Sequence, residues 1–203
     1  MTVTFETLCA YIEQELQTKQ PFILAIDGNS ASGKTTLACR LADRFGGDVI
    51  HMDDFFLPFS LRTYERLQEP GGNVHYERFY EQIIKPLQSG TTSFCWQRFE
   101  CSSGNYASEL CRIENPSLII IEGAYSMRPE FRQAYDMTLF LCAGPETQKE
   151  RIQHRNGSEK LHAFLEKWIP MENKYFEYYK IPEQCRFIFN TDFCPNNTSP
   201  CIR

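Results

Sequence analysis

The strongest constraint on the fold is a glycine-containing loop that lies between an apolar run and a helical pattern. Residues 28–35 have the spacing G-x-x-x-x-G-K-[ST]. The preceding residues 22–26 are all apolar, as in a parallel strand that is buried on both faces. After the loop, Leu37, Leu41 and Phe45 recur at helical spacing before a Gly-Gly pair. A strand, a tight loop and a helix in this order predict the first unit of an α/β fold.

The rest of the chain repeats this alternation of apolar runs and helical patterns. Further strands are predicted at residues 48–52, 118–121, 138–143 and 186–189. Helices are predicted at residues 5–16, 76–87, 146–155 and 159–179. The aromatic residues of 168–179 recur at helical spacing and are interpreted as core packing. The pattern predicts an α/β protein with a parallel sheet, in one domain spanning residues 1–193, followed by an irregular tail at 194–203.

The composition argues against several classes of function. The chain has 203 residues and a formal net charge of -5, which is unsuited to a protein whose main task is to coat nucleic acid. No apolar run approaches about 18 residues, so no membrane span is predicted. The nine cysteines are odd in number and include no C-x-x-C pair. This favours reduced thiols and a cytoplasmic location over a disulfide scaffold or a cysteine metal site.

The loop has the chemistry of a phosphate cradle. Its glycines allow successive N–H groups to turn inward, and the following helix adds its positive N-terminal end. Lys34 is placed to reach the β and γ phosphates, and the Thr35 hydroxyl is placed to ligate Mg²⁺. The sequence therefore predicts ATP and Mg²⁺ as cofactors, bound by Gly28, Asn29, Ser30, Ala31, Ser32, Gly33, Lys34, Thr35 and Thr36.

Acidic side chains follow three of the predicted strands. Ligands of a doubly wound sheet gather outside the carboxyl ends of the strands, so Asp27, Asp53 and Glu122 are candidates for a site. Glu122 is predicted as a Mg²⁺ ligand, with a capping role as the alternative. Asp53 is predicted to accept the proton of an attacking hydroxyl, with a helix N-cap as the alternative. Asp54 is interpreted as structural, and Asp27 is expected to pack beside the loop.

Together these residues resemble the uridine kinase family, over residues 20–190. The resemblance rests on the loop at 28–36, the block at 53–56, the strand end at 122–123 and an arginine-bearing lid. It implies a three-layer P-loop NTPase fold, with a five-stranded parallel sheet of order 2-3-1-4-5, flanking helices and a small lid. It also implies that Asp53 acts as general base, and that the metal ligands are Thr35, Asp53 and Glu122.

The lid is predicted at residues 150–162. Arg151 and Arg155 lie four residues apart, which places them on one helical face, and their counterparts in the family contact the ATP phosphates. The alternative is a solvated face that pairs with neighbouring glutamates. Gly157 supplies the hinge that a lid needs. The predicted catalytic residues are Asp53, Lys34, Arg151 and Arg155.

An acceptor-binding insertion is predicted at residues 53–115, and it departs from the family pattern. His75 stands where uridine kinases have an aspartate that binds the ribose, and Phe56 replaces a tyrosine. Residues 94–96 keep the aromatic rings but lack the acid. Two arginines in this region leave open a substrate with a carboxylate or a phosphate, with structural roles as the alternative. The predicted substrate-binding residues are Asp53, Phe56, His75, Arg78, Trp96, Arg98 and Tyr125.

The sequence therefore predicts an ATP-dependent kinase that acts on a hydroxyl of a small molecule, above all a nucleoside such as uridine or cytidine. Two alternatives stay open. The first is a kinase for an anionic acceptor, such as a nucleotide, a pantothenate-like acid or a sugar phosphate. The second is an accessory NTPase whose cradle drives partner binding, although the chain lacks a guanine-reading N-K-x-D sequence. No nucleic-acid or membrane partner is expected, and the sequence is compatible with a homo-oligomer.

Overall fold

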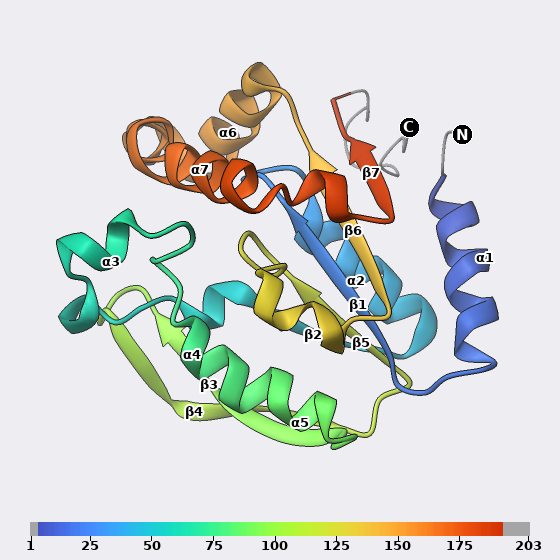
Figure 1. The fold of residues 1–203 in the computed structure, drawn as a ribbon. Coiled ribbons are helices and arrows are strands. Elements are labelled where there is room, and N and C mark those ends of the chain that lie inside the picture. The colour runs from blue at the N-terminus through green and yellow to red at the C-terminus, as the bar shows by residue number, and fades with distance from the viewer. Residues whose placement is uncertain (1–3, 193–203) are drawn as a thin grey trace.

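A five-stranded parallel sheet forms the centre of the protein (Figure 1). The computed structural model describes residues 4–192. In chain order the strands are β1 (Phe22–Gly28), β2 (Asp48–His51), β5 (Leu118–Glu122), β6 (Met137–Cys142) and β7 (Phe187–Asn190). Their order in the sheet is β2-β5-β1-β6-β7, and every neighbouring pair is parallel. When these five strands alone are numbered, the order is 2-3-1-4-5, which confirms the predicted fold class.

The register of the sheet brings three segments to one edge. Ile26 of β1 and His51 of β2 both pair with Glu122 of β5. The loop after β1, the turn after β2 and the end of β5 therefore start side by side. Because β1 and β5 are buried along their whole length, this edge stands on a rigid base. Such an edge is where ligands bind in open α/β sheets.

Helices cover both faces of the sheet (Figure 1). Alternate residues of β1 face two separate apolar cores, as the period of two in a strand requires. One core contains α1 (Phe5–Leu16) and α2 (Lys34–Phe45). The other contains the helical stretch 76–88 and α7 (Ile169–Tyr179). Both faces of β1 meet apolar side chains, which explains its uninterrupted apolar sequence.

The segment between β2 and β5 forms an insertion beside the sheet. Its elements are η1 (Met52–Phe55), η2 (Phe59–Leu61), α3 (Tyr64–Gln68), α4 (Tyr76–Phe79), the π-turn η3 (Tyr80–Ile84), α5 (Lys85–Gln88), β3 (Ser93–Glu100) and β4 (Asn105–Glu114). The last two form an antiparallel hairpin. The helix predicted at residues 76–87 is present as α4, η3 and α5, which follow one another without a gap from Tyr76 to Gln88. Pro86 follows the π-turn and takes one of the first positions of α5, where its missing N–H costs little.

The C-terminal helices carry a break at the predicted hinge. The segment α6 (Pro145–Ala163) consists of two helices joined at Gly157, whose φ of 78° and ψ of 167° are not helical. It continues through the π-turn η5 (Phe164–Trp168) into α7. The helices predicted at 146–155 and 159–179 are thus present, and the predicted tail at 194–203 lies outside the described residues.

Two 3-10 turns are the remaining short elements of the fold, η4 (Pro129–Ala134) and η6 (Pro182–Gln184). Between residues 4 and 192, no helix is long and apolar enough to cross a membrane. In the same range the free cysteines are Cys9, Cys39, Cys95, Cys101, Cys111, Cys142 and Cys185.

Gly28 lets the phosphate loop leave β1 while β1 stays in contact with β6. Its φ is +146°, and a Cβ at this position would lie 1.9 Å from the carbonyl oxygen of Leu141. We predict that Gly28→Ala lowers the free energy of unfolding by more than ~3 kcal/mol, because a backbone atom cannot move aside. The matched control is Gly90→Ala, where φ is +77° but the space around a Cβ is open; it should cost ~1–2 kcal/mol. Equal losses in chemical denaturation would contradict this account.

Candidate functional site

The loop after β1 has the backbone conformation of an anion-binding nest. Gly33 precedes α2 with a φ of 92°, and Ala31 has a φ of 61°. Lys34 begins α2 and folds back over the loop, where its Nζ donates to the carbonyl oxygens of Gly28 at 2.8 Å and Asn29 at 2.9 Å. The ammonium group and the N-terminus of α2 therefore direct positive potential at the same point.

Side chains outside the loop hold it in place. Asn29 exchanges two hydrogen bonds with Ala143: its Nδ2 donates to the carbonyl oxygen at 3.2 Å, and its Oδ1 accepts from the N–H at 3.1 Å. Gln148 of α6 donates from Nε2 to the carbonyl oxygen of Ser30 at 2.9 Å. The end of β6 and the start of α6 thus brace the loop from one side.

The two predicted lid arginines occupy different positions. Arg151 donates to the carbonyl oxygen of Ala31 at 3.1 Å, and to Oγ1 and the carbonyl oxygen of Thr191 at 2.9 and 2.7 Å. These bonds make it a brace between the loop and the end of β7, and they keep it off the cavity described below. Arg155, one turn further on, lines that cavity and donates from Nε to the Asn156 side chain at 2.8 Å.

Polar side chains from β2, β5 and α2 meet beside the loop. Thr35 Oγ1 donates to Glu122 Oε1 at 3.0 Å, and His51 Nδ1 lies 2.6 Å from the same oxygen. The hydrogen bond to Glu122 raises the pKa of His51. Asp53 opens into the same space. Although Asp53 is exposed to the cavity, its pKa is raised, first because the protein packed around the carboxyl reduces its hydration and second because Glu122 carries the same charge.

These oxygens suit a Mg²⁺ ion that also binds phosphate. Across residues 4–192 there is no group of three His, Cys, Asp or Glu side chains that could hold a metal by itself. Mg²⁺ in phosphate sites is held by one or two carboxylates and completes its shell with phosphate and water oxygens. Thr35, Asp53 and Glu122 provide donors of this type, and all three line one cavity.

Asp27 supports the loop from beneath. It is fully buried and accepts hydrogen bonds from the N–H of Gly28 at 2.7 Å, the N–H of Met127 at 3.1 Å and the hydroxyl of Tyr175 at 2.8 Å. Burial raises the pKa of Asp27 to about 7, although these donors and Lys34 oppose the shift. Its position beside the loop is the one that the sequence indicates.

Glu172 of α7 is a site residue that the sequence does not reveal. Its Oε2 accepts from the N–H of Ser30 at 2.8 Å, and its Oε1 accepts from the Ser30 hydroxyl at 2.6 Å. Burial raises its pKa, and Lys34 opposes this shift. Of the aromatic run 168–179, Tyr175 and Phe176 pack in the core as predicted, but Trp168 lines the cavity and Tyr178 is exposed. The available signal was that Glu172 shares the helical face of Tyr175 and Phe176, where an acid needs a partner.

A cavity of about 560 Å³ joins these groups. Predicted site residues that line it are Ser30, Ala31, Lys34, Thr35, Asp53, Phe56, Glu122, Tyr125 and Arg155. It is also lined by residues that the sequence did not single out, namely Phe59, Arg62, Asn73, Phe99 and Lys160, and by Trp168 and Glu172 from the run that the sequence assigns to core packing. The cavity therefore has one wall from the loop and strand ends, one from the insertion and one from the lid.

The predicted substrate residues Trp96 and Arg78 lie outside this cavity. Trp96 is buried and donates from Nε1 to Asp54 Oδ2 at 2.8 Å. Arg78 donates to the carbonyl oxygen of Asp54 and, at 2.9 Å, to that of Gln97. Its guanidinium also lies 4.4 Å from the centre of the Phe55 ring. Both side chains join the hairpin to η1, and Asp54 holds them there.

His75 and Arg98 also lie off the cavity. His75 Nδ1 is hydrogen-bonded to the Tyr106 hydroxyl, and Arg98 is exposed on β3. In a regular strand Arg98 would share a face with Trp96. The register of the hairpin shifts between Gln97 and Phe99, and a bulge of this kind changes which side chains face inward. Phe99 therefore lines the cavity in the place where the sequence predicts an arginine.

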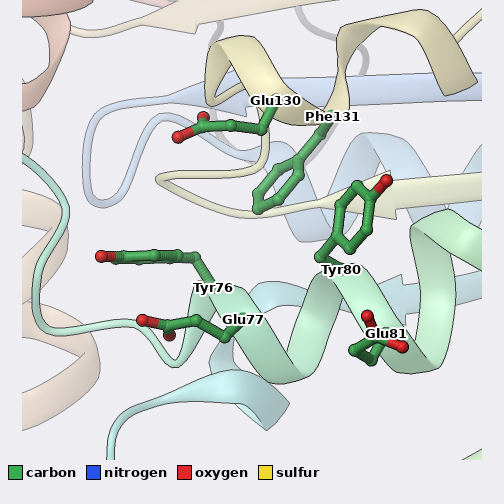
Figure 2. Close-up of a pocket in the computed structure, with 6 residues that line it drawn as sticks. All are labelled: Tyr76, Glu77, Tyr80, Glu81, Glu130 and Phe131. Atoms are coloured by element: carbon green, nitrogen blue, oxygen red, sulfur yellow. The ribbon is translucent and has the colours of Figure 1, made fainter.

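A second cavity, of about 540 Å³, lies between the helical stretch 76–88 and η4 (Figure 2). It is lined by Tyr76, Glu77, Tyr80, Glu81, Glu130 and Phe131. Each of its carboxylates pairs with an arginine or a lysine at 2.7 to 3.1 Å. With acidic walls and no loop amides, this cavity is unsuited to a phosphate group.

Comparisons with known proteins place the chain among kinases. No family model matches it. The uridine kinase of Geobacillus kaustophilus is 25% identical over 183 residues, covering 78% of this chain and 82% of the relative. That of Anoxybacillus flavithermus is 24% identical with the same coverage. A solved structure of a possible uridine kinase from Bacillus stearothermophilus is 22% identical, with a TM-score of 0.68, and covers 91% of this chain and 96% of its own.

The fold, the phosphate loop and these comparisons define the class: the chain is a P-loop kinase. Another solved structure, the D-glycerate 3-kinase of Cryptococcus neoformans, shares the fold with a TM-score of 0.57 at 13% identity, covering 92% of this chain and 95% of its own. Within the class the chain is uridine kinase-like, which confirms the resemblance found in its sequence.

The buried carboxyl of Asp27 makes the free energy of unfolding depend on pH. Its pKa of about 7 in the folded protein exceeds the reference value of 3.8. Protonation therefore stabilises the folded state, and this contribution is full at low pH and lost as the pH rises through about 7. Each unit of pKa shift is worth ~1.4 kcal/mol.

We predict that Asp27→Asn flattens the fall in unfolding free energy between pH 4 and pH 7. Denaturant titrations at a series of pH values measure this slope. The control is Asp43→Asn, which changes an exposed carboxylate of α2 and should leave the slope of the natural protein intact. A slope in Asp27→Asn as steep as that of the natural protein would show that the buried carboxyl does not control it.

Proposed function

We propose that this protein is an ATP-dependent kinase that transfers the γ-phosphoryl group to a hydroxyl of a small molecule. The observation that carries the proposal is the placement of the phosphate loop and the Asp53 carboxylate on the walls of one cavity. The aromatic rings that complete this cavity suit an organic acceptor better than water. The similarity to proteins named uridine kinase supports the same class of reaction.

The loop end of the cavity is suited to the phosphates of ATP. The loop amides, the N-terminus of α2 and Lys34 supply positive potential at one point. Arg155 and Lys160 add two cations from the lid. A bound Mg²⁺, for which Thr35 and the two strand-end carboxylates provide oxygens, would neutralise charge on the β and γ phosphates.

Asp53 acts as the general base in the proposed reaction. It accepts the proton of the acceptor hydroxyl as the acceptor oxygen bonds to the γ phosphorus and the bond to the β,γ-bridging oxygen breaks. Lys34 and Arg155 offset the charge that develops on the phosphates. The products are the phosphorylated acceptor, ADP and a proton that Asp53 releases to solvent.

The acceptor space is bounded by aromatic rings of the insertion and of the turn after β5. Phe56, Phe59, Phe99 and Tyr125 line it, and flat rings favour a ring or a carbon chain as partner. Uridine is the acceptor that the relatives' names point to, so uridine, with cytidine as a second pyrimidine nucleoside, belongs in any acceptor screen. An accessory NTPase would instead hydrolyse ATP at a rate that no small acceptor changes.

The role of Asp53 is tested by Asp53→Asn. We predict that kcat for the best acceptor falls by about two decades or more, because an amide cannot accept the hydroxyl proton, while ATP binding changes little. An assay coupled to ADP release gives kcat, and calorimetry gives the ATP affinity. Asp43→Asn serves as the exposed control. Turnover near that of the natural protein would remove Asp53 from the mechanism.

The nucleotide site is tested by ligand-dependent thermal unfolding. We predict that ATP with Mg²⁺ raises the Tm, and that EDTA removes most of the rise. A ligand at 100 times its Kd stabilises a protein by ~2.7 kcal/mol, which is readily measured. Lys34→Ala should show a much smaller rise, because the loop then lacks its ammonium group. If neither ATP nor Mg²⁺ changes the Tm, the proposed function fails.

A further inference from the structure

Arg62 is a half-buried arginine on the cavity wall, directly after η2. Its Nε donates to the carbonyl oxygen of Leu57 at 2.8 Å. Its guanidinium lies over two rings, 4.5 Å from the centre of Phe59 and 5.6 Å from that of Phe99. One hydrogen bond and two aromatic faces therefore fix the plane of the guanidinium on the cavity wall.

The two terminal nitrogens of Arg62 are not used by the protein. Within the part of the chain that the structure describes, neither has a hydrogen-bond or carboxylate partner. Four other half-buried or buried arginines use these atoms: Arg66 bonds Glu77, Arg78 bonds Gln97, Arg128 bonds Glu130 and Arg151 bonds Thr191. Arg132 is half-buried and its Nη2 also lacks a hydrogen-bond partner among the described residues, but Arg132 does not line the cavity. Arg62 thus offers a free pair of donors in the geometry that forms bidentate hydrogen bonds with a carboxylate or a phosphate.

Two of the three carboxylates that line the cavity are committed elsewhere, and no ion pair joins the third, Asp53, to Arg62 among the described residues. Glu122 binds Thr35 and His51, and Glu172 binds Ser30. The charge of Arg62 is therefore not balanced by a neighbouring acid, although burial lowers its pKa. A neutral ligand would displace water from around the guanidinium and leave its charge without a counterion, which is costly. An anionic group would displace the same water and would also balance the charge.

A continuous row of rings joins Arg62 to the proposed base. The Phe56 and Phe99 rings lie 6.0 Å apart, and those of Phe59 and Phe99 lie 6.2 Å apart. Phe56 follows the η1 turn that begins with Met52 and contains Asp53. Asp53, these rings and Arg62 line the same cavity, so a small molecule bound against the rings can face both Asp53 and Arg62.

We infer that Arg62 binds an anionic group, a carboxylate or a phosphate, of the same small molecule whose hydroxyl faces Asp53. The acceptor is thus a hydroxy acid or a sugar phosphate and not a neutral nucleoside. The inference rests on the proposed kinase function and names the substrate class of that site. It also moves the anion-binding role to Arg62 from Arg78, which lies outside the cavity and whose terminal nitrogens bind the Gln82 side chain and two backbone oxygens.

The experiment compares acceptors that differ in charge alone. The pairs are glycerate with glycerol, gluconate with glucose and glucose 6-phosphate with glucose, and uridine and cytidine represent neutral nucleosides. Turnover is measured by ADP release, and binding is measured by calorimetry in the presence of a non-hydrolysable ATP analogue. The proteins are the natural chain, Arg62→Gln, Arg62→Lys and the control Arg112→Gln. Arg112 is an exposed arginine of β4 that pairs with Glu114 at 3.0 Å.

We expect at least one anionic acceptor to be preferred over its neutral counterpart by the natural chain. Arg62→Gln should lower kcat/KM for it by about tenfold to a hundredfold, with KM for ATP unchanged. Arg62→Lys should recover part of the loss, because it restores the charge without the paired donors. Arg112→Gln should behave as the natural chain does. The hydroxy acids and the sugar phosphate, compared with each other, distinguish a carboxylate from a phosphate.

Several outcomes would overturn the inference. One is efficient phosphorylation of uridine or cytidine that Arg62→Gln leaves unchanged. Another is failure of the natural chain to bind or phosphorylate any anionic member of the panel. In both cases, a Tm that still rises with ATP and Mg²⁺ would show that the nucleotide site is intact. The proposed function is then judged separately from the inference about Arg62. Thermal unfolding of each variant shows whether a loss of activity reflects a loss of fold.

Discussion

The site depends on an anion-binding loop whose positive potential the protein balances with its own oxygens. Lys34 donates to loop carbonyl groups, and Glu172 accepts from the N–H and the hydroxyl of Ser30. Beneath the loop, Asp27 accepts from the N–H of Gly28. These hydrogen bonds hold the loop in one conformation, and a phosphate that accepts from Ser30 or Lys34 would replace the present oxygen partners of these groups. The loop is therefore shaped before any ligand enters.

The same hydrogen bonds connect the loop to distant parts of the chain. Asn29 holds the end of β6, Gln148 and Arg151 reach the loop from α6, and Glu172 reaches it from α7. The phosphate loop is thus the place where the sheet and the two C-terminal helices meet. A change in the position of those helices alters the donors that a phosphate meets.

The fold and the loop end of the site could be predicted from the sequence because both depend on local patterns. A parallel strand buried on both faces is an unbroken apolar run, as at residues 118–121. The residues that follow such strands lie at one edge, and Thr35, Asp53 and Glu122 accordingly line one cavity. These predictions needed the order of the elements but no knowledge of how side chains pack.

The acceptor end could not be predicted because it depends on which way individual side chains face. Trp96 and Arg78 are aromatic and basic, as predicted for a binding site. Their N–H groups, however, donate hydrogen bonds to Asp54 and Gln97. A shift of register in the hairpin puts Phe99 where the alternation predicts Arg98. Arg62 carries no motif, and its importance comes from the partners that it lacks within residues 4–192. Such features arise from contacts between segments far apart in the sequence.

The break in α6 has a geometric consequence for the lid. Gly157 stands between Arg155 and Lys160, and both of these cations line the cavity. Because the two halves of α6 keep their own hydrogen-bond ladders on either side of the break, torsion at one glycine turns one cation relative to the other without unwinding either half. The torsions of Gly157 therefore set how Arg155 and Lys160 are oriented relative to each other on the cavity wall.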